Sequence, residues 1–168
     1  MKSQIPNFIN KKGFTILELL IFMALFSVIL VVLTSLFAAT VQQKLETQGM
    51  SAVESDYSYI ISRLQYDFGR ATDVVTPLNY GDTTNTLTLE IEGQSHTYIL
   101  NGSNLELTTP AGTYQLQGVR SSVSNLSFQK IGNTGGKPTV RVQMIITSTA
   151  QNTTGTETSE IDTIFGIK

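Results

Sequence analysis

The acidic residue Glu18 stands at the start of a long apolar stretch, and its chemistry needs an explanation. No charged residue follows it until Lys44. A charged side chain at the centre of a membrane helix costs roughly 2.5 to 3.5 kcal/mol. Glu18 therefore either reaches the membrane interface, where a helix N-terminus also favours a carboxylate, or serves a function that needs this charge. Geometry alone leaves both interpretations open.

The residues around Glu18 form a recognisable pattern. Two basic residues, Lys11 and Lys12, precede Gly13 and Phe14, and Glu18 follows four residues after Phe14. A continuous apolar run comes next. This combination resembles the processing site of type IV prepilins and type II secretion pseudopilins, so the chain is identified as type IV pilin-like.

The resemblance implies a series of partners and modifications. A prepilin peptidase is expected to cut after Gly13 and to methylate the new amino group of Phe14. The mature helix is expected to lie in membrane lipid, and then to join other pilin or pseudopilin subunits through an inner-membrane assembly platform. In such filaments the carboxylate of Glu18 would neutralise the terminal ammonium of a neighbouring subunit. Because two buried charges offset each other's desolvation, that pair would set the axial register.

Other chemistry finds little support in the sequence. His96 is the single histidine and has no evident partners for a metal site, so we expect a surface or half-buried strand residue. Asp73, Asp82 and Glu92 match no calcium-loop spacing and are expected to be solvated loop carboxylates. No nucleophile elbow or phosphate-binding loop is present. We predict no enzyme, no cofactor and no metal. The formal charge of -2 and the scattered basic residues also argue against a nucleic-acid site.

The apolar segment predicts a single membrane span. It covers residues 19–41, and a membrane helix needs about 20 residues. The segment before it carries Lys2, Lys11 and Lys12 without an acidic residue, which predicts a cytoplasmic N-terminus and an extracytoplasmic C-terminal domain. Removal of these three lysines would leave 8 basic and 13 acidic residues, a side-chain charge of -5.

The rest of the chain predicts an α+β fold, with a long N-terminal helix packed on a C-terminal antiparallel sheet. We expect a leader at 1–13, a membrane or filament-core helix at 14–41, the outer half of that helix at 42–72 and a globular sheet domain at 73–168. Apolar residues at spacings of three and four continue the helix to about Arg70. Tyr57, Tyr59 and Tyr66 are interpreted as packing residues of the helix.

Alternation and turn residues predict the sheet. Residues 73–85 are interpreted as an irregular connection, and Asn101 with Gly102 as a hairpin turn. Met144, Ile145 and Ile146 interrupt alternation, which suggests a central strand covered on both faces. The expected strands are 86–91, 97–100, 104–108, 112–116, 126–131, 139–147 and 160–167.

Two departures from the major pilins indicate the type of subunit. No proline occurs between Pro6 and Pro77, and the chain has no cysteine, whereas many major pilins have a helix-bending proline and a disulfide. Residues 61–72 also resemble the helix end of W-type minor pilins and J-type pseudopilins. These features favour a minor subunit. A pilus, a secretion system and a DNA-uptake apparatus all stay open.

An alternative function is a single-pass anchored binding or sensor domain that never enters a filament. Glu18 discriminates between the two hypotheses. A simple tether has no use for a carboxylate one helical turn after a cleavage site, whereas a filament subunit does.

Overall fold

The computed structural model of the protein describes residues 13–133, 135–150 and 155–167. Of the leader predicted at residues 1–13, only Gly13 is among them, so Lys11 and Lys12 lie outside the described residues. The chain divides into two compact units, Met1–Val41 and Gln42–Lys168.

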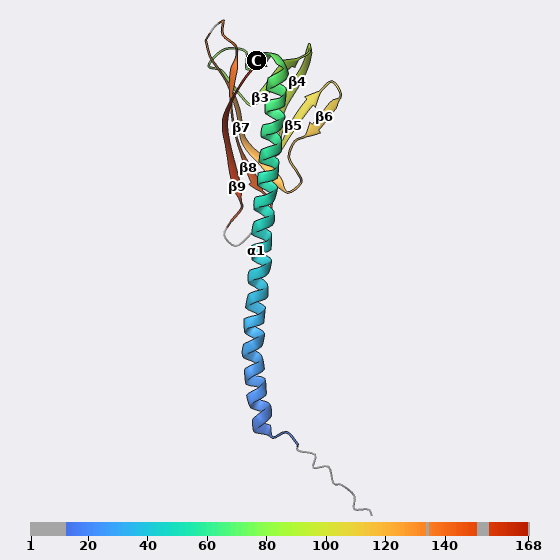
Figure 1. The fold of residues 1–168 in the computed structure, drawn as a ribbon, viewed down its shortest axis with the longest axis vertical. Helices are drawn as coiled ribbons and strands as arrows, with labels where there is room; N and C mark the ends of the chain where they lie inside the picture. The colour runs from blue at the N-terminus through green and yellow to red at the C-terminus, as the bar shows by residue number, and fades with distance from the viewer. Residues whose placement is uncertain (1–12, 134, 151–154, 168) are drawn as a thin grey trace, which may run out of the picture. The chain divides into compact units, whose positions relative to one another are not determined.

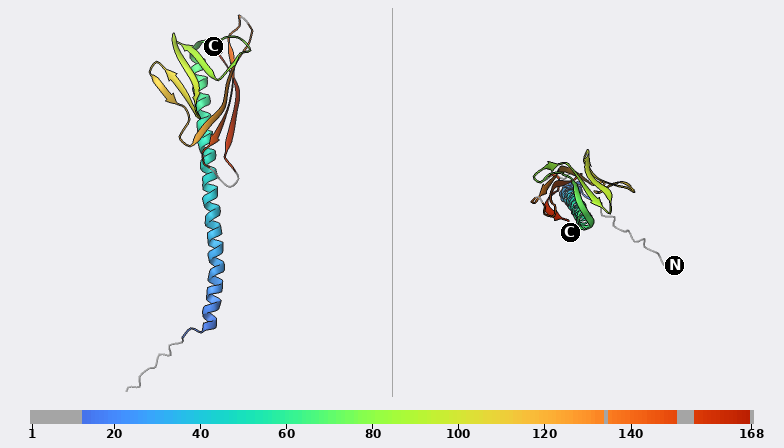
Figure 2. Two further views of the ribbon diagram at one scale, coloured as in Figure 1. Left: turned by 180° about the vertical axis from the view of Figure 1, so that it is seen from behind. Right: turned by 90° about the horizontal axis from the view of Figure 1, so that it is seen from above.

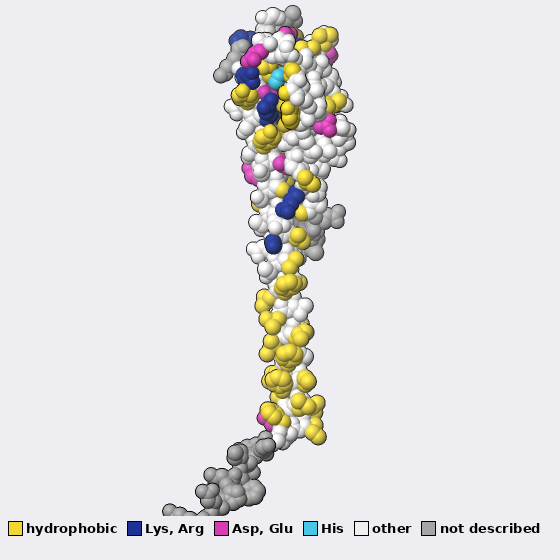
Figure 3. Space-filling model, turned by 90° about the vertical axis from the view of Figure 1, so that its right-hand side faces the viewer, with side chains coloured by type: hydrophobic (Ala, Val, Ile, Leu, Met, Phe, Trp, Pro, Cys, Tyr) yellow, Lys and Arg dark blue, Asp and Glu magenta, His cyan; other side chains and the backbone are white. Residues whose placement is uncertain are grey.

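Helix α1 covers Ile16–Arg70 and begins with the apolar segment. Hydrophobic side chains line this part of the helix on the face that Figure 3 shows, and they are exposed along its length. Its few hydroxyls donate hydrogen bonds to carbonyls of the preceding turn, as the predicted membrane span requires of polar groups. These bonds join Ser27 to Ala24, Thr34 to Leu30, Ser35 to Val31 and Thr40 to Leu36, at 2.8 to 2.9 Å.

The second half of α1 buries residues along one face only, as the sequence predicted. Its buried residues recur mostly every three or four positions, which places them in one stripe along the helix. The helix ends at Arg70, in agreement with the predicted end. The buried positions are Gly49, Val53, Ile60, Leu64, Asp67 and Phe68.

The strands confirm the α+β class, but they form two antiparallel sheets rather than one. The first sheet has the order β1-β3-β4-β5-β6 and the second β2-β7-β8-β9. Their bounds are β1 Ala71–Thr76, β2 Thr83–Thr84, β3 Thr86–Ile91, β4 Gln94–Asn101, β5 Asn104–Thr109, β6 Gly112–Gln115, β7 Ser121–Ile131, β8 Thr139–Ser148 and β9 Thr158–Gly166.

Both sheets curve around one side of the outer half of α1, as the views in Figures 1 and 2 show. The core fills the space between them and the helix. Phe68 of the helix stacks on Phe165 of β9 with ring centroids 5.2 Å apart. The largest fully buried side chains are Tyr98, Phe68, Phe128, Ile60, Leu64, Leu87, Leu89, Ile91, Leu105, Leu107, Met144 and Ile146.

Two tight turns set the register of the first sheet. Glu92 and Gly93, with φ of 53° and 73°, connect β3 to β4, and positive φ at both central residues is typical of a type I′ hairpin. This turn was not predicted, and β4 therefore starts earlier than expected. The next hairpin is where we expected it, but Asn101 pairs with Asn104, so the turn residues are Gly102 and Ser103.

The prediction of an irregular connection at residues 73–85 is wrong in part. Strand β1 occupies its first residues and pairs with β3, and β2 pairs with β7. Buried Lys130 holds the segment between them, because its Nζ donates to the carbonyls of Val74 and Leu78 at 2.8 and 3.1 Å. The Thr and Val residues of β1 are typical of a strand, but Pro77 and Gly81 after it favoured the prediction of a loop.

Strand β8 is central, as predicted, and lies between β7 and β9. Its burial nevertheless alternates along the whole strand: Met144 and Ile146 are buried, whereas Ile145 is half-buried. One face therefore meets the core, and the other is only partly covered.

The interpretation of the helix tyrosines as packing residues holds for one of the three. Tyr57 packs against the core. Tyr59 and Tyr66 are 53% and 55% exposed, so packing does not explain them. They lie beside the buried stripe of the helix, which runs through Ile60, Leu64 and Phe68.

Candidate processing and assembly site

The start of α1 is organised by a helix cap. Thr15 precedes the helix, and its Oγ1 accepts a hydrogen bond from the backbone N–H of Glu18 at 3.2 Å. Its carbonyl accepts the N–H of Leu19 at 3.1 Å. Thr15 is therefore the N-cap and Glu18 the third helical residue, which is the arrangement of a capping box. The cap fixes Glu18 in the first turn, where the helix dipole favours a negative charge.

Gly13 and Phe14 lie just before this cap. The Phe14 side chain is 81% exposed. A Cβ added to Gly13 would meet no atom within 4 Å, and Gly13 is not among the glycines with positive φ. Within the described residues, neither packing nor backbone conformation requires glycine at this position.

A second group of polar residues lies in the unit Gln42–Lys168, called the outer unit from here on, and the sequence did not reveal it. Asp67 is fully buried in α1. Its Oδ2 accepts the Tyr98 hydroxyl of β4 at 2.5 Å and the Nε of Arg63 at 3.2 Å. His96, also on β4, places Nδ1 at 3.8 Å from the same oxygen. The helix and the first sheet thus share one carboxylate.

The electrostatics of this group follow from its burial. Burial, and then the neighbouring Asp67 carboxylate, raise the pKa of the Tyr98 hydroxyl far above its ordinary value. Burial opposes the charge of Arg63, but Asp67 and Tyr98 outweigh it and raise the guanidinium pKa. Two buried atoms, Asp67 Oδ1 and His96 Nδ1, have no hydrogen-bond partner among the described residues.

Three carboxylates that the sequence did not favour as a calcium site, Asp73, Asp82 and Glu92, do not converge. The Asp73 carboxylate accepts a hydrogen bond from the backbone N–H of Val74. The Asp82 carboxylate accepts hydrogen bonds from the backbone N–H and the side-chain amide of Asn79. Glu92 pairs with Arg70 at 2.7 Å, and this hydrogen bond lowers the pKa of Glu92. Over the part of the chain that the structure describes, no three acidic, histidine or cysteine side chains are placed to hold a metal ion.

Comparison with known families bears on the N-terminal site. Residues 9–34 match the family model described as the prokaryotic N-terminal methylation motif. This motif supports a type IV pilin-like protein, and it contains Gly13, Phe14, the Thr15 cap and Glu18. No curated protein and no solved structure gives a significant match to the chain.

The methylation motif has consequences for the whole chain. It implies processing by a prepilin peptidase and assembly with other pilin subunits, and it indicates a structural rather than an enzymatic protein. Among the described residues, one helix, α1, is long and apolar enough to cross a membrane. The motif and this helix fit a membrane-anchored protein.

Sequence reasoning identified the residues of the motif and missed the buried group. His96 is half-buried, with 13% of its side chain exposed, as its strand position suggested. Its neighbours Arg63 and Asp67 stand four residues apart on one helix, which was a readable signal for an ion pair. Tyr98 lies on β4, which pairs with β3 and β5, and no local sequence pattern connects it to Asp67.

Proposed function

We propose that a prepilin peptidase cleaves this chain between Gly13 and Phe14, methylates Phe14, and thereby prepares a subunit of a type IV pilus or a type II secretion or competence pseudopilus. The observation that carries the proposal is the methylation motif at residues 9–34. The surroundings of Gly13 support it. Nothing in the described chain requires a glycine there, so the proposed reason for this glycine is an enzyme that must approach the backbone closely.

Intact mass tests the processing step. Protein extracted from membranes of cells with an active prepilin peptidase should lack residues 1–13 and carry one additional methyl group on Phe14. Gly13→Leu should retain the leader, because a large side chain blocks the approach to the scissile bond. Ser3→Leu adds the same bulk elsewhere in the leader and should be processed normally. A native protein that keeps Met1 to Gly13 would contradict the proposal.

The mature protein is proposed to span the membrane once, with its N-terminus at the cytoplasmic side and residues 42–168 outside. Loss of the leader removes Lys2, Lys11 and Lys12, which hold the N-terminus at the cytoplasmic face. The helix is then easier to extract from lipid by the assembly platform. Glu18 would pair with the terminal ammonium of a neighbouring subunit and set the register of the filament.

The cap at Thr15 suggests a sharp test of this role, because Glu18 has two candidate functions. As the third helical residue, it can close a capping box, and glutamine does this equally well. Only a carboxylate neutralises an ammonium. Glu18→Gln and Glu18→Val should therefore both insert into the membrane, and both should lower incorporation into sheared filaments. Glu46→Gln, on the same helix beyond the apolar segment, is the control for loss of charge.

Normal incorporation of Glu18→Gln together with poor incorporation of Glu18→Val would show that capping, not charge pairing, is what assembly needs. Equal incorporation of all variants would show that assembly does not need the Glu18 carboxylate. Absence of the native chain from sheared filaments would favour the anchored binding domain that never enters a filament.

Within a filament, we propose a minor rather than a major subunit. The absence of cysteine, the absence of proline between Pro6 and Pro77, and the likeness of residues 61–72 to W-type and J-type subunits support this assignment. Quantitative mass spectrometry of sheared filaments should find this chain far scarcer than one dominant pilin. If it is the most abundant subunit, the minor role is wrong and the pilin-like character remains.

A further inference from the structure

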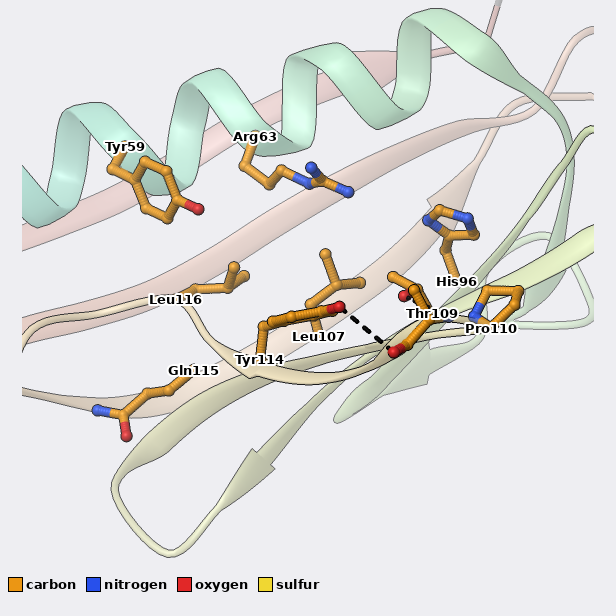
Figure 4. Close-up of a pocket in the computed structure, with 10 residues that line it drawn as sticks. Tyr59, Arg63, His96, Leu107, Thr109, Pro110, Tyr114, Gln115 and Leu116 are labelled. Carbon is orange, nitrogen blue, oxygen red and sulfur yellow. Dashed lines mark hydrogen bonds between the residues drawn. The ribbon is translucent and has the colours of Figure 1, made fainter.

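A pocket of about 580 Å³ opens between α1 and the first sheet, beside the buried polar group (Figure 4). Tyr59 and Arg63 of the helix line one side. His96 of β4 and Tyr114 of β6 lie across from them, with Leu107 and Leu116 in the wall. Its volume falls within the roughly 300 to 1,000 Å³ of small-molecule sites.

One side of this pocket offers hydrogen-bond donors to an anion. A guanidinium carries five N–H groups, and Asp67 takes the one on Nε of Arg63. Even with the Tyr98 hydroxyl as a further neighbour, donors remain on the two η nitrogens. None of the ten lining residues is acidic. The nearest carboxylate is that of the buried Asp67, which lies behind Arg63 and His96 and is paired with Arg63.

The histidine in the wall has one ring nitrogen without a hydrogen-bond partner among the described residues. The Nδ1 atom of His96 is buried and has no hydrogen-bond partner among the described residues. Buried polar atoms in native proteins almost always have a partner, which is protein, water or ligand. This nitrogen lies 3.8 Å from the Asp67 carboxylate, so His96 and Arg63 form a polar edge of the pocket with Asp67 behind both.

The remaining surface suits an apolar, flat group. The rings of Tyr59 and Tyr114 are 53% and 51% exposed and come from opposite sides of the pocket (Figure 4). Leu107 and Leu116 are buried behind them. Aromatic rings that face a gap gain free energy from stacking with a third ring.

We propose that this pocket binds a carboxylate attached to an aromatic or similarly apolar body. The carboxylate pairs with the free donors of Arg63 beside His96, and the body lies between the two tyrosines. Such a group is carried by a free aromatic acid or by a polypeptide that ends in an aromatic residue. The site lies outside the methylation motif, and its occupancy does not require cleavage or assembly.

The test uses the full chain in phospholipid nanodiscs and nuclear magnetic resonance titration. The probes are 3-phenylpropionate and its neutral amide, 3-phenylpropanamide. Because hydrogen bonds to charged groups are about twice as strong as neutral ones, the acid should bind about tenfold more tightly than the amide. A Gly-Gly-Phe peptide with a free carboxylate forms the second arm. Tighter binding of the peptide identifies a polypeptide source, and tighter binding of the free acid a small molecule; both outcomes support the site.

Variants place the binding in this pocket. Arg63→Gln should remove the preference for acid over amide, whereas Arg120→Gln, an exposed arginine elsewhere, should keep it. Tyr114→Ala should weaken both probes by about threefold or more, and Tyr80→Ala, a half-buried tyrosine outside the pocket that contacts Lys130, should weaken neither. Since Arg63→Gln leaves Asp67 without its ion pair and risks the fold, Tyr114→Ala and the comparison of acid with amide decide the question alone. Equal affinity of acid and amide, binding unchanged by Tyr114→Ala, or no binding of the acid overturns the proposal.

Discussion

At the scale of single residues, Asp67 is a fully buried carboxylate of the outer unit. It has no exposed surface, yet it carries a carboxylate that Tyr98 and Arg63 contact. Removing one partner of a buried charge is costly, because the remaining charge has lost both water and its counterpart. The pair also joins α1 to the middle of the first sheet, so it links secondary structure elements that are distant in sequence.

Tyr98→Phe tests this link with the smallest chemical change. Loss of the hydroxyl leaves Asp67 short of one donor, and we expect the free energy of unfolding to fall by about 1 to 3 kcal/mol. Tyr66→Phe is the matched control, because the Tyr66 hydroxyl only accepts an exposed bond from Arg70 and should matter by less than about 0.5 kcal/mol. Urea unfolding followed by circular dichroism measures both. Equal effects of the two variants would contradict a special role for Tyr98.

The raised pKa of Tyr98 adds an alkaline signature. Below the ordinary tyrosine pKa of 10.0, both the folded and the unfolded chain hold the proton. Above it, the unfolded chain releases the proton while the buried hydroxyl keeps it, so stability falls as pH rises. The native protein should lose about 1.4 kcal/mol per pH unit above pH 10 that Tyr98→Phe does not lose. Urea midpoints between pH 8 and pH 11 measure the difference, and parallel curves would refute it.

At the scale of secondary structure elements, α1 combines two kinds of surface in one helix. Its first part is apolar all round, and its outer part has one buried stripe. Gly49 lies in that stripe and weakens the helix by propensity, at roughly 1 kcal/mol relative to alanine. The structure shows why a glycine fits: an added Cβ would lie 3.0 Å from the Oγ of Ser148 at the end of β8.

Gly49→Ala therefore sets two effects against each other. In the native background, contact with Ser148 should cancel or exceed the gain in helix propensity. In the Ser148→Ala background the obstructing hydroxyl is gone, and Gly49→Ala should stabilise the chain by up to about 1 kcal/mol. Urea unfolding of the two single variants and the double variant closes the cycle. A stabilising Gly49→Ala in the native background would show that close approach is not the reason for the glycine.

At the scale of the whole molecule, the two compact units differ in what stabilises them. Each buried hydrophobic residue belongs to the unit Gln42–Lys168, and the described residues before Gln42 are exposed. The apolar segment of α1 therefore adds nothing to the described core. Its exposed side chains require lipid or other subunits instead, because so much exposed apolar surface is not tolerated in water.

A chain that begins at Gln42 should consequently fold without the apolar segment. We expect a soluble, monomeric protein with helix and strand signals in circular dichroism and a cooperative unfolding transition. The comparison is the full chain in detergent, which should show the same urea midpoint when unfolding of the outer unit is followed. An insoluble product, or one that unfolds without cooperativity, would mean that the outer unit depends on the first part of α1 or on partners.

The sequence alone determined the features that neighbouring residues encode. The apolar run, the carboxylate at Glu18, the helix end at Arg70 and most strands are read within a few positions along the chain. The cap at Thr15, which starts the helix at Ile16 rather than at residue 14, was not predicted. Periodicity and turn residues are local features, so they can be recognised in the sequence before the fold is known. Gly13, Phe14 and Glu18 were singled out in this way, and they lie inside the matched motif.

Only the tertiary structure decided how distant elements meet. The division into two sheets, the contact of Gly49 with Ser148 and the bond between Asp67 and Tyr98, 31 residues apart, depend on strand pairing and on the path of the chain. The exposure of Tyr59 and Tyr66 has the same origin, because helical spacing alone does not say where the edge of a curved sheet falls. Partners brought together by folding leave no local pattern, since their interaction is selected by shape and burial across the core.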